Sequence, residues 1–94
     1  MAQFTTRVEL HNATYNDYET LHREMDRRGF ARTIRADNGE VYQLPTAEYD
    51  CSATNGRATV LAAAQAAAAQ TGKSASILVT ESAGRTWSGL QKIR

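Results

Sequence analysis

The fold is decided by residues 30–44, which read FARTIRADNGEVYQL. Two runs that mix apolar and polar residues, Phe30–Arg35 and Val41–Leu44, flank the dipeptide Asn38-Gly39. Asn-Gly between two such runs is among the strongest local signals for a β-hairpin, because both residues tolerate the positive φ of a tight turn. The two runs are therefore predicted to be antiparallel neighbours in a sheet.

The segment before this hairpin has the pattern of a strand followed by a helix. From Phe4 to Leu10 the even positions are mostly apolar and the odd ones polar, which is the period-two pattern of a strand with one buried face. Thr14 with Asp17 three residues later is a variant of the capping box that begins a helix. Apolar residues then recur at helical spacing and Gly29 is placed as the stop, so a helix is predicted over Tyr15–Arg28.

The segment after the hairpin repeats this order of elements. Pro45 cannot donate a hydrogen bond to a sheet, so we expect a break before the strand continues over Ala47–Ser52. An alanine-rich helix is predicted over Arg57–Thr71, and a strand that is apolar on both faces, and therefore covered on both, over Ala75–Thr80. Thr86–Leu90 is expected to form a short strand or a packed tail.

The predicted order is β-α-β-β-α-β with a short C-terminal appendix, which is the split β-α-β arrangement of ferredoxin-like folds. We therefore expect a single α+β domain over residues 1–94. Both helices should cover one face of a four-stranded antiparallel sheet and leave the other face available.

Composition narrows the class of protein without naming a function. The 94 residues carry 11 basic and 10 acidic side chains, so no net field points to a nucleic-acid, membrane or acidic partner. The single cysteine, Cys51, excludes an intramolecular disulfide and favours a reducing compartment. Met1–Leu10 lacks the apolar centre of a signal peptide and no stretch is apolar enough to span a membrane, so a cytoplasmic location is expected.

The residues that can transfer a proton near neutral pH are the two histidines, His11 and His22. His11 follows the first predicted strand, where it is either a solvent-facing loop residue or part of a polar site. No glycine-rich phosphate loop and no pair of histidines at metal-binding spacing is present, and Cys51 would have to converge with both histidines from a third element. No metal and no cofactor are therefore predicted.

Positive charge gathers between the first predicted helix and the strand that follows it, and Glu24 and Asp26 offset part of it. The arginines of this segment are Arg23, Arg27, Arg28, Arg32 and Arg35. The planar fork of arginine suits bidentate contact with phosphate. The alternative is that Arg27 and Arg28 complement the dipole at the end of the helix. Among the aromatic residues, Tyr49 follows the Pro45 break and is the one we expect to serve a site by stacking on a base.

Several short segments of the chain match the sequence pattern of a known protein family. The matching residues are Tyr18, Leu21 and Met25 on the first helix, Gly29-Phe30 after it, Thr33–Asp37 with Gly39 at the turn, Gln43-Leu44 and Ala47-Glu48-Tyr49. Together they make roughly residues 4–80 resemble the GhoS-like antitoxins of bacterial type V toxin-antitoxin systems. The resemblance implies a ferredoxin-like fold similar to the endoribonucleases of CRISPR adaptation. It also implies sequence-selective, metal-independent cleavage of a toxin's messenger RNA.

The resemblance also implies roles for particular residues. The family's basic residue on the first helix aligns with His22, which is flanked by Arg23, and its aromatic residue aligns with Tyr49. A histidine in place of an arginine is a departure from the family, because it can transfer a proton but is a weaker permanent phosphate contact. The resulting hypothesis has His22 or His11 as the base or acid, Arg23 with Arg27 or Arg28 on the phosphate, and Tyr49 as the stacking platform.

The competing interpretation is a non-catalytic module that binds a protein or nucleic-acid partner, which the near-zero net charge and the missing acid-base cluster favour. A homodimer is expected on both interpretations, because an edge strand in so small a fold invites pairing. The apolar residues expected to cover that edge are Leu78, Trp87, Leu90 and Ile93. The alternative is that the C-terminal segment folds back on its own sheet.

Overall fold

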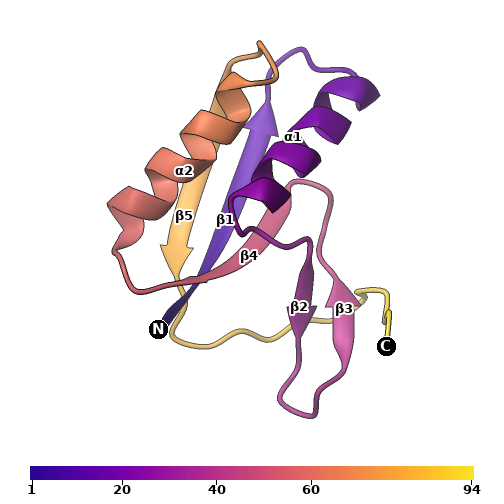
Figure 1. Ribbon diagram of the computed structural model, residues 1–94. Coiled ribbons are helices and arrows are strands. Elements are labelled where there is room, and N and C mark those ends of the chain that lie inside the picture. The colour runs from indigo at the N-terminus through magenta and orange to yellow at the C-terminus, as the bar shows by residue number, and fades with distance from the viewer.

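The computed structural model describes residues 1–94, which form two antiparallel sheets and two helices (Figure 1). The elements follow the order β1 (Ala2–Leu10), α1 (Tyr15–Arg27), β2 (Thr33–Arg35), β3 (Val41–Gln43), β4 (Glu48–Ala53), α2 (Arg57–Ala69) and β5 (Ala75–Glu81). The chain is thus a mixed α+β protein, as the hydrophobic pattern predicts.

β1 is the central strand of the larger sheet, whose order is β4-β1-β5 with antiparallel pairing on both sides. The even residues of β1 from Phe4 to Leu10 are buried, and the odd residues lie on the opposite face and are mostly exposed. This alternation confirms the period-two prediction. It also defines two faces of the sheet, a core face and an open face.

Both helices cover the core face (Figure 1). α1 begins with the predicted capping box, in which the Asp17 amide donates to Thr14 Oγ1 over 3.2 Å and the Thr14 amide donates to Asp17 Oδ2 over 2.9 Å. It ends before Gly29, whose φ of +87° is the left-handed conformation that a helix stop requires. α2 packs its small alanines against the strands, and neither helix is long and apolar enough to cross a membrane.

The hairpin forms as predicted, with β2 and β3 paired so that Ile34 lies opposite Tyr42. The expected four-stranded sheet, however, is divided into sheets of three and two strands. Before β2, the chain joins the larger sheet only at Ala31 and Asp50, whose amides each donate to the other's carbonyl over 2.8 Å. Pro45 and a turn separate β3 from β4, because proline cannot continue the ladder. The arrangement remains compatible with a ferredoxin-like fold.

The C-terminal segment, residues 82–94, folds back on the hairpin (Figure 1). The Gln43 amide donates to the Gln91 carbonyl over 2.8 Å, and the Ile93 amide donates to the Val41 carbonyl over 2.7 Å. Trp87 packs its ring against Tyr42 at a centroid distance of 5.5 Å. The tail therefore covers the outer edge of β3.

β5 is less covered than its apolar sequence predicts. Ala75, Ile77 and Val79 are half-buried against the core, but Leu78 points to the open face and is 65% exposed. The expectation that this strand is covered on both faces is therefore wrong for a single chain, because both helices lie on the same side of the sheet.

Candidate functional site

The best-formed polar contact inside the fold joins His22 on α1 to Tyr49 on β4. His22 Nδ1 lies 2.6 Å from the Tyr49 hydroxyl oxygen, and their ring centroids are 5.8 Å apart. Tyr49 is fully buried and also packs edge-on against Phe30. Burial raises the pKa of Tyr49, so its hydroxyl keeps its proton near neutral pH.

The direction of this hydrogen bond follows from what else the two groups can reach. The Tyr49 hydroxyl has no other partner, and a buried O–H that does not donate costs about 1–3 kcal/mol. Tyr49 therefore donates to Nδ1, which leaves the ring proton of neutral His22 on Nε2. Burial of the ring lowers the pKa of His22, and the nearby Arg32 lowers it further, against a smaller opposing effect of Glu19. His22 is thus held in its neutral form.

His22 lines a shallow hollow of about 500 Å³ between α1 and the segment that leads into β2. We call it the His22 hollow; its walls are Glu19, His22, Arg23 and Asp26 from α1 and residues 30–33. Neither Arg23 nor Arg32 forms an ion pair, although the carboxylates of Glu19 and Asp26 line the same hollow. Arg32 Nε is also buried without a hydrogen-bond partner. The hollow therefore holds two guanidinium groups that have no ion-pair partner, beside two carboxylates that do not pair with them.

Arg27 and Arg28 do not belong to this hollow. Both pair with Glu24, Arg28 over 2.8 Å and Arg27 over 3.1 Å, and Arg28 Nη1 also donates to the Glu24 carbonyl at the end of α1. The Arg28 hydrogen bond and the charges of both arginines lower the pKa of Glu24. These contacts favour the interpretation in which the two arginines stabilise the helix end.

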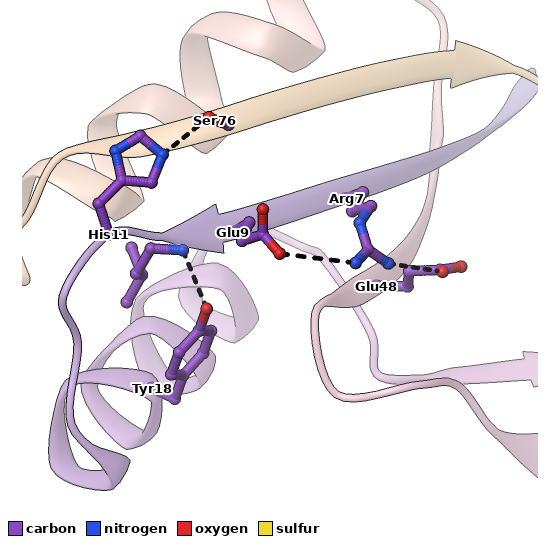
Figure 2. Close-up of polar contacts among 7 residues, drawn as sticks. Arg7, Glu9, His11, Tyr18, Glu48 and Ser76 are labelled. Atoms are coloured by element: carbon purple, nitrogen blue, oxygen red, sulfur yellow. Dashed lines mark hydrogen bonds and ion pairs between the residues drawn. The ribbon is translucent and has the colours of Figure 1, made fainter.

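His11 lies on the other side of the sheet from His22. Its ring nitrogens are 3.1 Å from Ser74 Oγ and 2.8 Å from Ser76 Oγ, and Figure 2 shows the contact with Ser76 beside the end of β1. Ser76 is an exposed residue of the open face. The two histidines therefore do not form an acid–base pair.

The remaining charges of the open face are already paired. Arg7 lies between Glu9, at 3.8 Å, and Glu48, at 3.3 Å (Figure 2). Arg85 lies 2.6 Å from Asp50. No cluster of three or more acidic, histidine or cysteine side chains is close enough to hold a metal ion. The open face thus offers no unpaired cation comparable to those of the His22 hollow.

Tyr49 does not have the role that the sequence predicts, and Arg32 is a residue of the hollow that the sequence does not single out. Tyr49 is fully buried, so neither face of its ring can stack on a base, and its role changes to positioning His22. Arg32 takes part in the hollow although nothing in the sequence separates it from the neighbouring arginines. An aromatic ring beside free space is instead found in Trp87, which lines a second hollow of about 450 Å³ with Arg35 and Arg85.

Comparison of the chain with protein-family models, curated proteins and solved structures gives no match. The resemblance to GhoS-like antitoxins therefore stays a prediction.

Proposed function

We propose that this protein binds RNA by contacting its phosphates at the His22 hollow. The observation that carries the proposal is the pair of unpaired arginines, Arg23 and Arg32, beside the neutral ring of His22. Guanidinium groups bind phosphate oxygens through charge-assisted, bidentate hydrogen bonds. Such backbone contacts supply much of the affinity for a nucleic acid.

The geometry supports binding more directly than cleavage. A general base needs a free lone pair on the nitrogen that meets the ribose 2′-hydroxyl. In His22 the lone pair is on Nδ1 and accepts a hydrogen bond from the Tyr49 hydroxyl, whereas Nε2 carries a proton and can only donate. His22 therefore acts as a hydrogen-bond donor to phosphate. Cleavage of a toxin messenger RNA, which the resemblance implies, would require the other tautomer if His22 were the base, and the protonated ring if it were the acid.

RNA binding is tested by fluorescence anisotropy with a labelled single-stranded RNA pool at low salt, where release of counterions makes phosphate binding strongest. Replacing both arginines of the hollow, Arg23→Gln with Arg32→Gln, should weaken binding about tenfold or more. Arg57→Gln is the matched control, since Arg57 is exposed and forms no ion pair. Arg23→Gln alone, on the exposed side of α1, shows whether a loss of binding reflects the hollow or a folding defect at Arg32.

Two results would contradict the proposal. One is absence of RNA binding at low salt, and the other is equal weakening by the Arg23 and Arg57 variants. Cleavage is a separate question, answered by incubating the wild type and His22→Ala with the same pool. Cleavage that persists in His22→Ala would remove His22 from any catalytic role.

The second candidate function is a non-catalytic module that acts through protein contacts. The exposed Leu78 on the outer strand of the sheet favours it. A cytoplasmic location is compatible with both functions, since Cys51 is a free, half-buried thiol.

A further inference from the structure

β5 is an outer strand of its sheet and pairs only with β1. At one end of this pairing the Ser82 amide donates to the Gln3 carbonyl over 2.8 Å, and at the other the His11 amide donates to the Ser74 carbonyl over 2.9 Å. Since the direction of backbone groups alternates along an antiparallel strand, the even residues of β5 face β1. The odd residues are Ala75, Ile77, Val79 and Glu81. Their backbone amides and carbonyls point away from β1 and form a free edge.

This edge differs from the outer sides of β4 and β3, where other parts of the chain form backbone hydrogen bonds. Ala31 bonds to the outer side of β4, and the C-terminal tail bonds to the outer side of β3. Natural proteins protect an open edge with proline, lysine or a bulge. Ala75–Thr80 contains no proline and no charge, and its register with β1 is continuous. The β5 edge is therefore built to be paired.

We propose that a second copy of this chain pairs with the free edge, β5 against β5 in antiparallel orientation, about a twofold axis at Leu78. Leu78 is the middle residue of the strand and is 65% exposed on the open face. In this register it lies opposite the partner's Leu78, and each leucine covers the other. The two larger sheets then become one continuous sheet.

The backbone hydrogen bonds and the leucine contact together favour this register over registers that are shifted by two residues. The outward-facing residues meet as hydrogen-bonded pairs, Ile77 with the partner's Val79 and Ala75 with the partner's Glu81, which gives roughly eight new hydrogen bonds. Leu78 then occupies a position without such bonds, where the two Cα atoms are closest, about 4.5 Å apart. A shift by two residues would place Leu78 opposite a serine or threonine and leave both leucines exposed.

The pattern of side chains favours a second copy over an unrelated strand. With the axis at Leu78, Ser76 lies opposite the partner's Thr80, so a small hydroxyl residue meets another on each side of the leucine pair. The only charge of the strand, Glu81, lies opposite the partner's Ala75, so no like charges meet. The strand is thus complementary to itself.

The register is tested by cross-linking. In a Cys51→Ala background, Leu78→Cys places two thiols across the axis at a Cα separation that a disulfide accepts, so oxidation should give a covalent dimer. Thr80→Cys is the matched control on the same exposed face, because it would lie opposite the partner's Ser76. The proposal is overturned if Leu78→Cys does not cross-link, or if both variants cross-link equally.

The oligomeric state is tested on the native chain by sedimentation velocity over a range of concentrations. The wild type should be a dimer, and Leu78→Lys should weaken the dimer about 100-fold or more, because it removes the leucine contact and places two like charges opposite each other. Ile93→Lys is the matched control, since Ile93 is 49% exposed but lies on the tail beside β3. A monomeric wild type would refute the proposal, and so would a dimer broken by Ile93→Lys but not by Leu78→Lys.

Discussion

The hydroxyl of Tyr49 can be removed without changing the packing around it, which makes Tyr49→Phe the sharpest test of the site. The ring is fully buried between Phe30 and His22, so phenylalanine fills the same space. The variant loses only the 2.6 Å hydrogen bond to His22 Nδ1. Its effects can therefore be assigned to that bond.

The loss should lower the free energy of unfolding by about 1 kcal/mol, the usual net value of one intramolecular hydrogen bond. Its cost stays near this value because His22 is only half-buried and water can reach the ring. For a domain of this size, 1 kcal/mol corresponds to a decrease in Tm of about 4–8 °C. Thermal unfolding followed by circular dichroism measures it.

The sign of the accompanying change in the pKa of His22 tests the direction of the hydrogen bond. A hydroxyl that donates to Nδ1 stabilises the neutral ring, so its removal should raise the pKa of His22 toward the value of a free histidine. NMR titration of the ring protons measures this pKa in both proteins. A decrease in the pKa would refute the reasoning, because it would mean that Nδ1 carries the proton and donates to Tyr49.

Tyr18→Phe is the control for this experiment. The Tyr18 ring lies 6.3 Å from the His22 ring between centroids, but its hydroxyl accepts the Leu10 amide over 2.9 Å (Figure 2). The control therefore removes a hydroxyl close to His22 without removing a bond to it. It should leave the pKa of His22 unchanged, and an equal change in both variants would point to a general loosening of α1.

The pKa of His22 is lowered on folding, so the folded state binds fewer protons than the unfolded state between this lowered pKa and about pH 6.5. The free energy of unfolding should therefore rise with pH through that window and level off above it. His22→Gln should make this pH dependence weaker, which urea unfolding at a series of pH values measures. Hydrogen bonds from the side chains of Lys92, Asn38 and Tyr42 lower the pKa of Glu40 to about 2. The contact between Glu40 and Lys92 should stabilise the tail fully above about pH 4.5 and lose this effect toward pH 2. Hydrogen exchange of the backbone amides of the tail measures the change. Burial and then the nearby acidic charge raise the pKa of Cys51, so it should react with a disulfide reagent more slowly than a free thiol. Met25→Ala should cost about 2–5 kcal/mol, measured by urea unfolding, because Met25 is fully buried.

Most elements of this fold follow from local patterns in the sequence. The even-numbered apolar residues of β1, the capping box at Thr14 and the turn at Gly39 each act over a few residues, and each appears where the sequence predicts it. Their physical causes are side-chain alternation, hydrogen bonds to free amides and a φ of +89° that suits glycine. The sequence predicts a break at Pro45, but it does not predict that the sheet divides there into sheets of three and two strands.

The candidate site shows what local patterns could not provide. His22 could be named from its chemistry and Arg23 from its position, but Arg32 could not be separated from the other arginines of the same segment. From the sequence, Arg27 and Arg28 are candidates either for phosphate contact or for stabilising the helix end, and in the structure both pair with Glu24. Which cations are free depends on distances between side chains.

The places of the two helices, the core face of β1 and the residue types available for chemistry can be predicted from the sequence, because they depend on the chain's own local pattern. Contacts in the folded chain bury Tyr49 against His22, place His11 on the opposite face, and cover β3 with the tail while the β5 edge stays open. The physical reason is that hydrogen bonding and burial depend on contacts between segments far apart in the sequence. In this chain those contacts decide which groups remain free to bind a partner.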